Sequence, residues 1–335
     1  MSINQLFKTA PVSTILLASF IGLYILQVLM GVDANNPTSE ALISWGANFL
    51  PLTMIDGPWR LISSGFLHIG LMHLLFNGFA MYFFGQVAEP MFGSVKFLLL
   101  FLLSVIGGNL LNNQMTWLGI LDGTGQPGLS AGASGGIMGI GAALLVAALF
   151  KISVNGMVLN LKSLIFIMGI NLVYGFAVPG IDNAGHIGGA ITGLLIALGI
   201  GFAHRQRLMT TLNSRLAASA PYQTEYVNYQ ADASTKKVID DDSHSAENSI
   251  YNNIEVHNPV NSYNNTDINA QFDNRYAADK HENIQSVIIN EDKVKSKPTV
   301  IWQLLPWIMM VLIAIGFIGW WLVIHNQILQ VLATQ

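Results

Sequence analysis

The sequence predicts an all-α, polytopic membrane protein: a six-helix bundle followed by one extra C-terminal transmembrane helix. Two features of the 335 residues predict this fold class. Hydrophobic residues make up 52% of the chain and charged residues 10%, whereas a soluble domain carries about 25% charged residues. Apolar runs of roughly membrane-spanning length also recur along the chain, at residues 13–32, 71–88, 97–112, 133–150, 163–178, 186–203 and 301–324.

Each apolar run is expected to form a helix, because roughly 20 residues cross the hydrocarbon core and about 17 are the lower limit. The first run follows a lysine, as in a signal peptide. It is too long for the core of a typical signal peptide and no A-x-A site follows it, which favours an uncleaved span. The chain has no cysteine, so disulfides and thiolate metal sites are excluded.

The segment at residues 204–300 differs sharply in composition from the rest. It holds ten of the fifteen Lys and Arg residues and thirteen of the nineteen Asp and Glu residues. Low hydrophobicity and scattered charge cannot bury enough surface to offset chain entropy. We therefore predict a six-span core at 1–203, a polar disordered cytoplasmic linker at 204–300, and a seventh transmembrane helix with a short outer tail at 301–335.

The positive charges predict the orientation. With the N-terminus inside, the outer segments contain only Arg60, as the positive-inside rule requires. The inner segments then contain Lys8, Lys96, Lys151, Lys162, Arg205, Arg207, Arg215, Lys293, Lys295 and Lys297. We expect an integral protein of a bacterial cytoplasmic (inner) membrane, with the N-terminus inside and the C-terminus outside.

The first outer loop, residues 33–70, is long and only partly polar. Its pieces ISWGANFLPL and PWRLISSGFLH are typical of short helices or turns in the outer interface. Arg60 beside Trp59 is either a surface anchor or a strut that holds the fold of the loop.

Polar residues gather at the starts of three spans that run from outside to inside. The second span opens with His68, His73 and Asn77, the fourth with Ser134 in GASGG, and the sixth with His186 in NAGHIGG. At 1.5 Å per residue, these side chains share a depth within about 10 Å of the outer interface. Polar groups at membrane depth are costly and usually face the bundle interior or a water-filled cavity.

Each of these residues also has a purely structural interpretation. A serine in a membrane helix usually bonds its own turn, and His73 and Asn77, four residues apart, could bond each other. A metal site of three histidines is a weaker alternative, because His68 and His73 lack i, i+4 spacing. The pattern G-x-S-x-G is also the nucleophile elbow of soluble hydrolases. That elbow needs a preceding strand, whereas a turn-rich loop precedes GASGG here.

Taken together, the cluster predicts acyl transfer. A serine needs a neighbouring base, and neutral imidazole is the usual one, so His186 can activate Ser134 if their helices touch. Glycines permit that approach: Gly135, Gly136 and Gly139 on one helix, Gly189 and Gly193 on the other. His73, Asn77 and a free backbone N–H at Ser134 are candidate oxyanion donors. Because Asp182 lies in the preceding loop, we expect a Ser–His dyad.

Four motifs resemble those of the rhomboid intramembrane serine proteases, in the bacterial six-plus-one arrangement. They are WR at 59–60, H-x4-H-x3-N at 68–77, GASG at 132–135 and A-G-H-x-x-G-x-x-x-G at 184–193. The resemblance implies that Ser134 and His186 form the dyad and that His73 and Asn77 hold the oxyanion. It also implies structural support from His68, Trp59, Arg60, Gly132, Gly135, Gly189 and Gly193.

Two features depart from the family pattern or from its simplest members. The fourth residue after the family serine is often an aromatic ring that stacks on the histidine, and here it is Met138, which orients an imidazole less firmly. The seventh span is absent from six-span members. Its Trp320, Trp321 and His325 are interpreted as interface anchors. Glu89 resembles an acidic residue that members keep at the inner end of the second helix.

The expected function is intramembrane serine endopeptidase, cleaving single-span membrane proteins near the outer membrane face. We expect the lipid bilayer as surroundings and no cofactor, metal or nucleic acid. The main alternative is a non-catalytic rhomboid-like binder of transmembrane clients, which would be expected to lack the serine or the histidine. A small-solute transporter would instead place its polar groups near mid-membrane, in paired broken helices.

Overall fold

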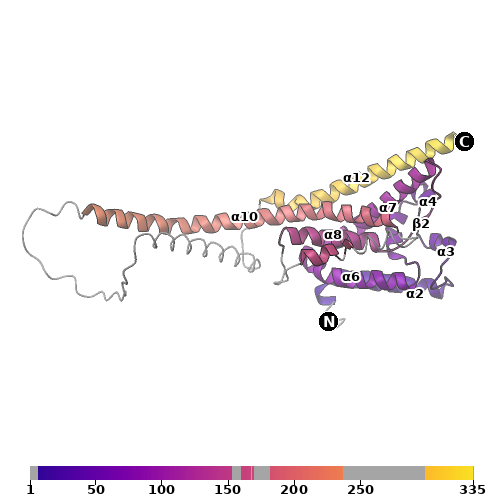
Figure 1. The fold of residues 1–335 in the computed structure, drawn as a ribbon, viewed down its shortest axis with the longest axis horizontal. Helices are drawn as coiled ribbons and strands as arrows, with labels where there is room; N and C mark the ends of the chain where they lie inside the picture. The colour runs from indigo at the N-terminus through magenta and orange to yellow at the C-terminus, as the bar shows by residue number, and fades with distance from the viewer. Residues whose placement is uncertain (1–6, 153–159, 167, 170–181, 237–298, 335) are drawn as a thin grey trace, which may run out of the picture. The chain divides into compact units, whose positions relative to one another are not determined.

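The structure, a computed structural model, describes residues 7–152, 160–166, 168–169, 182–236 and 299–334 (Figure 1). The chain is a mostly helical, polytopic membrane protein. It divides into two compact units, residues 1–207 with 298–335, and residues 208–297. The first unit carries the candidate site.

Five helices in the described residues are long and apolar enough to cross a membrane. They are α2 (Pro11–Leu29), α6 (Leu71–Phe92), α7 (Ser94–Leu121), the Asn183–Ser214 part of α10 (Asn183–Lys236), and α12 (Val300–Ala333). The run predicted at 133–150 forms the shorter helix α8 (Ser134–Leu149). In the run predicted at 163–178, residues 163–166 and 168–169 are helical, and the others lie outside the described residues.

The first loop folds into short elements, as its sequence predicts. They are α3 (Ser39–Ser44), β1 (Asn48–Phe49), α4 (Leu50–Ile55), α5 (Arg60–Ser63) and a 3-10 turn, η1 (Ser64–Phe66). The expectation of an all-α fold is wrong in one detail. Strand β1 pairs antiparallel with β2 (Leu129–Ser130), which lies just before the GASGG motif. Two residues per strand make a clip between loops and not the sheet of a soluble hydrolase.

Helix α10 continues to Lys236, beyond residue 203, where the sequence predicts a change to a polar linker. Residues 204–236 contain no glycine and one proline, so little in their sequence breaks a helix. The rest of the predicted linker, residues 237–298, lies outside the described part of the chain.

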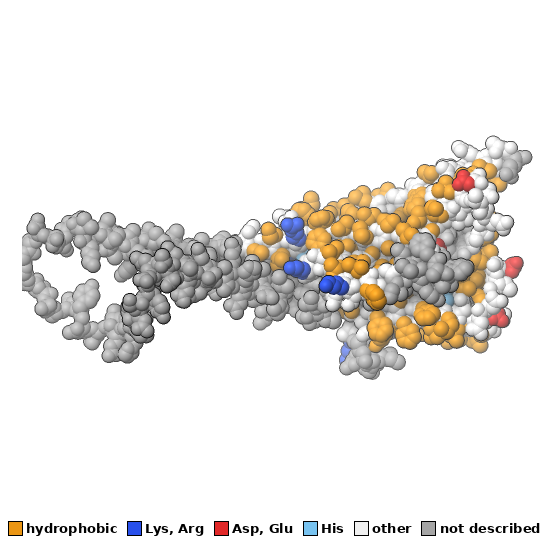
Figure 2. Space-filling model, in the orientation of Figure 1, with side chains coloured by type: hydrophobic (Ala, Val, Ile, Leu, Met, Phe, Trp, Pro, Cys, Tyr) orange, Lys and Arg blue, Asp and Glu red, His pale blue; other side chains and the backbone are white. Residues whose placement is uncertain are grey.

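The main hydrophobic core lies among α2, α6, α7 and α8, with a contribution from α10. The outer surface of the same bundle is also apolar. Figure 2 shows hydrophobic side chains over its visible face, with Lys and Arg toward one end and Asp and Glu toward the other. Such a surface suits contact with lipid, because apolar patches of this extent are rare on soluble proteins.

A buried carboxylate joins three helices at one end of the bundle. Glu89, near the end of α6, is 1% exposed. It accepts hydrogen bonds from the backbone N–H groups of Val12 and Ser13 in the first turn of α2, at 2.9 and 2.8 Å. It also accepts from the hydroxyls of Ser13 and Ser94, the latter at the start of α7. An acceptor at a helix N-terminus satisfies amides that otherwise lack partners.

Helix α12 packs on α7 and α4, and its polar side chains bond to the protein. Trp320 donates to the Gln114 side chain at 3.0 Å, and Trp321 donates to the carbonyl of Thr53 at 3.1 Å. These bonds fix α12 to the bundle. The interpretation of Trp320, Trp321 and His325 as interface anchors stays a prediction.

Candidate active site

The site begins where α8 and α10 touch through glycines. A Cβ atom added at Gly189 would overlap the carbonyl oxygen of Gly135, and one at Gly193 would overlap that of Gly139. A Cβ atom at Gly135 would lie 3.3 Å from the carbonyl oxygen of Gly185. The two backbones are therefore in direct contact, an approach that only residues without a side chain permit.

Ser134 and His186 flank this contact. Ser134 is the first residue of α8, and His186 lies in the first turn of α10, next to Gly185. Both side chains are half-buried. The Nδ1 atom of His186 is buried and has no hydrogen-bond partner among the described residues. No hydrogen bond joins Ser134 to His186 in the described structure, and catalytic hydrogen bonds are often long before a substrate is bound.

Asp182, in the loop before α10, caps the helix that carries His186. Its carboxylate accepts from the backbone N–H of Gly185 at 2.7 Å, from Asn112 of α7 at 2.9 Å and from the Ser130 hydroxyl at 2.6 Å. It thus links the start of α10 to α7 and to β2. An aspartate directly before a helix is a preferred N-cap, so this role could have been predicted.

His73 faces the backbone just before Ser134. Its Nδ1 atom accepts from the backbone N–H of Ile69 at 3.3 Å. In a neutral imidazole the proton then lies on Nε2. The Nε2 side of the ring lies against Gly132, where an added Cβ atom would be 2.9 Å from Nε2, and the Gly132 φ is +146°. His73 therefore presents a donor to the backbone two residues before Ser134.

Asn77, one turn after His73, is 5% exposed. Its amide donates to the backbone carbonyl of His73 at 3.0 Å. Asn77 therefore does bond His73, but through the backbone of His73 and not through its ring. An amide nitrogen carries two hydrogens. This bond therefore occupies one of them and leaves the other for a ligand.

His68 is a core residue and is 2% exposed. Its ring packs 5.2 Å from that of Phe20 and 5.4 Å from that of His73. It precedes the span formed by α6. Burial, together with the nearby His73, lowers the pKa of His68 to about 3, so the ring is neutral at physiological pH and supports His73 by packing.

Arg60 is a strut of the first loop. Its guanidinium donates to the carbonyls of Ile43 at 2.6 Å and Ala47 at 3.2 Å. Trp59 packs against Gly46, where a Cβ atom would lie 2.6 Å from the indole ring. These contacts resolve the alternatives for Arg60 in favour of the strut. They fix the chain that leads into β1.

Met138 is 7% exposed, in the fourth position after Ser134. It lies one turn into α8 and is buried within the bundle. A flexible thioether fills such space without the fixed face of an aromatic ring.

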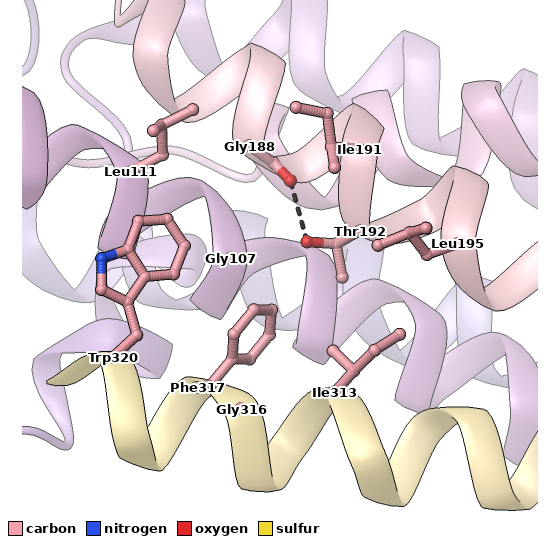
Figure 3. A pocket seen from close by; sticks show the side chains of 10 residues that line it. All are labelled: Gly107, Leu111, Gly188, Ile191, Thr192, Leu195, Ile313, Gly316, Phe317 and Trp320. Atoms are coloured by element: carbon pink, nitrogen blue, oxygen red, sulfur yellow. Dashed lines mark hydrogen bonds between the residues drawn. The ribbon is translucent and has the colours of Figure 1, made fainter.

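An apolar cavity of about 340 Å³ lies elsewhere, between α7, α10 and α12. Figure 3 shows Gly107, Thr192, Phe317 and Trp320 among its lining residues. The Thr192 hydroxyl donates to the Gly188 carbonyl at 2.8 Å and the Trp320 indole donates to Gln114, so both side-chain polar groups of the wall are satisfied. Neither Ser134 nor His186 lines this cavity. In the described part of the chain, no group of three His, Cys, Asp or Glu residues is placed to hold a metal.

Comparison with known proteins identifies a family. The Rhomboid domain family matches residues 56–202, the range that contains all the candidate residues above. Among curated proteins, the chain is 32% identical over 219 residues to "Rhomboid protease AarA" of Providencia stuartii, covering 59% of this chain and 76% of the relative.

Two further relatives share shorter regions. "Rhomboid protease GluP" of Bacillus subtilis (strain 168) is 37% identical over 183 residues, covering 54% of this chain and 34% of the relative. "RHOMBOID-like protein 6, mitochondrial" of Arabidopsis thaliana is 33% identical over 162 residues, covering 48% and 50%. The chain thus spans about a third of the length of GluP and half of the length of RHOMBOID-like protein 6.

Proposed function

The chain belongs to the rhomboid family, and from this premise we propose that it is an intramembrane serine endopeptidase with a Ser134–His186 dyad. The observation that supports the proposal most is the glycine contact between α8 and α10, since it brings together the helix starts that carry Ser134 and His186. Two of the relatives, GluP and AarA, are named rhomboid proteases.

In the proposed mechanism, His186 removes the proton from the Ser134 hydroxyl as that oxygen attacks the scissile carbonyl carbon. His186 then donates the proton to the leaving amine, as a general base and acid in turn. Water then attacks the acyl-enzyme: His186 accepts a proton from the water and returns it to the Ser134 oxygen as the carboxylic acid product leaves. Asp182 does not bond the imidazole ring but fixes the start of its helix, because it caps the Gly185 amide.

The oxyanion of the tetrahedral intermediate needs donors that are fixed before the reaction. We assign this role to the His73 Nε2–H, the second N–H of Asn77 and the backbone N–H of Ser134. The bond from Ile69 to the Nδ1 atom of His73 supports the assignment, because it leaves the proton on the nitrogen near Gly132.

The proposed membrane arrangement is six spans plus one, with the N-terminus inside. It combines α2, α6, α7, α8, the segment at 163–178, α10 and α12. The Lys and Arg side chains visible in Figure 2 lie toward one end of the bundle, as the positive-inside rule expects of the inner end. Ser134 then lies near the outer face, where water can reach it.

The proposed substrates are single-span membrane proteins. A helical peptide bond hides its carbonyl carbon, so the cleaved segment must be extended. Substrates with helix-weakening Gly, Ala, Ser or Pro near the outer end of their span are therefore expected.

The test is co-expression with a single-span reporter substrate, comparing wild type with Ser134→Ala and His186→Ala. Both variants are expected to lose cleavage. Reaction of the purified chain with a fluorophosphonate probe gives a second readout without substrate: wild type should be labelled and Ser134→Ala should not. Undiminished cleavage in both variants refutes the dyad. A wild type that binds the reporter substrate but neither cleaves it nor reacts with the fluorophosphonate probe favours the alternative of a non-catalytic binder.

A further inference from the structure

The C-terminal half of α12 is bonded to the first loop of the core. Trp321 donates its indole N–H to the Thr53 carbonyl at 3.1 Å, and the His325 Nδ1 lies 2.7 Å from the Met54 carbonyl. A carbonyl only accepts, so Nδ1 carries the proton. The two rings stack, with centroids 4.8 Å apart and planes 16° apart. Both bonds end on α4.

The same surface is completed by buried apolar side chains. Ile324 and Ile328 of α12 are 0% and 5% exposed, and they share a cluster with Leu50 and Met54 of α4 and with Trp117 of α7. Trp117 also donates to Gln327 of α12 at 3.1 Å. Helix α4 thus contacts both α12 and α7.

From α4, a short path leads to Ser134. Thr53, whose carbonyl binds Trp321, accepts from the Phe49 N–H through its hydroxyl at 3.0 Å. Phe49 and Asn48 form β1, which pairs with Leu129 and Ser130 of β2. Only three residues separate Ser130 from Ser134.

A second branch reaches the helix of His186. Ser130 donates to Asp182 at 2.6 Å, and Asn112 joins Asp182 to the side chain of Asn48. The strand pair is therefore connected to Ser134 by three residues of chain, and to the start of α10 by hydrogen bonds that end on Asp182.

We propose that Trp321 and His325 are positioning residues: through α4 and the β1–β2 pair, they hold the loop before Ser134 and the start of α10 in their reactive arrangement. Helix α12 is then a working part of the active site and not only a membrane anchor. The consequence for Ser134 rests on the proposed function, whereas the mechanical link from α12 to β2 does not.

The experiment uses the full chain in lipid nanodiscs with four variants. His325→Ala removes the donor to Met54, and His325→Asn restores a donor at the Nδ1 position. Trp321→Phe removes the indole N–H but keeps a ring to stack. Asn326→Ala, at an exposed position on the same turn, is the matched control. The readouts are fluorophosphonate labelling rate, hydrogen exchange at residues 47–56 and 129–134, and thermal unfolding.

The labelling rate of His325→Ala is expected to fall roughly three- to tenfold, which corresponds to the free energy of one or two hydrogen bonds. Hydrogen exchange should become faster at residues 47–56 and 129–134. Rescue in His325→Asn and wild-type behaviour in Asn326→Ala would support the proposal. A lower unfolding temperature with unchanged labelling at 25 °C would indicate a role in stability alone and would overturn the positioning role. Unchanged labelling and exchange in Trp321→Phe and His325→Ala would overturn the proposal.

If His325→Ala does not fold, Trp321→Phe decides the question by the same readouts. If wild type itself is not labelled, the proposed function fails, but hydrogen exchange still tests the mechanical link from α12 to β2. Faster exchange at residues 129–134 in the variants would then support that link, and unchanged exchange would contradict it.

Discussion

The contact between Gly135 and Gly189 allows a quantitative test with one methyl group. In Gly189→Ala, the new Cβ atom would overlap the Gly135 carbonyl oxygen and lie 2.6 Å from its carbonyl carbon. That separation falls about 0.8 Å short of the 3.4 Å at which ordinary contact begins. The obstructing atoms belong to a backbone, so no side chain can turn aside, and α8 must move away from α10.

The cost follows from this geometry. Overpacking of a close contact destabilises a protein by about 1–3 kcal/mol, and a displacement of about 1 Å between reacting groups can cost roughly 10²-fold in rate. The displacement falls between the helices that carry Ser134 and His186. We therefore expect Gly189→Ala to lose activity by roughly 10²-fold, a larger effect than its change in stability explains.

The matched control is Gly22→Ala in α2, the same chemical change at a helical glycine with nothing within 4 Å of an added Cβ atom. The assay compares the fluorophosphonate labelling rate and thermal unfolding of the two variants in detergent. Gly22→Ala should label as wild type does. A Gly189→Ala chain with both wild-type labelling and wild-type unfolding would refute the argument from close backbone contact.

Three further predictions concern the supports of the site. Asp182→Ala should lower the free energy of unfolding by at least the 0.5–2 kcal/mol of a lost N-cap, measured by thermal unfolding, and an unchanged midpoint would contradict its capping role. Arg60→Met should remove about 1.5–3 kcal/mol of charged hydrogen bonding to Ile43 and Ala47, seen as faster proteolysis within residues 38–56; wild-type resistance would count against the strut. For His68, the folded-state pKa of about 3 lies below the ordinary 6.5, so the unfolded chain binds the proton first as pH falls. Stability should therefore drop between pH 6.5 and 3, by up to about 1.4 kcal/mol per pH unit, and His68→Phe should lose this part of the pH dependence; superimposable pH profiles of the two chains would contradict it.

Helix starts were easier to predict from the sequence than helix ends. Helix α6 begins at Leu71, after Gly70 with a φ of +88°, as the start of its apolar run indicates. Helix α7, in contrast, continues to Leu121, although its apolar run stops at residue 112. The residues that follow include Asn113, whose amide is buried and donates to Asn48. The sequence shows the polar residue but not its distant partner.

The candidate site shows the same limit. The motifs indicated which residues gather, because a serine, two histidines and an asparagine at one depth are unusual in a membrane. They could not indicate the β1–β2 clip, since two residues per strand leave no periodic pattern. The contacts of Trp321 and His325 could not be predicted either, because their partners are backbone carbonyl groups, which every residue has. The dyad itself stays a prediction.

The docking of α12 has a practical consequence for dissection of the molecule. The bonds from α12 to Thr53 and Met54 and its apolar seam with Leu50 and Trp117 join chain segments before residue 122 to segments after residue 299. Two separately synthesised pieces, divided between these segments, would each carry one half of a complementary surface. Co-expressed in one membrane, they should find each other and reconstitute the intact assembly without a covalent connection.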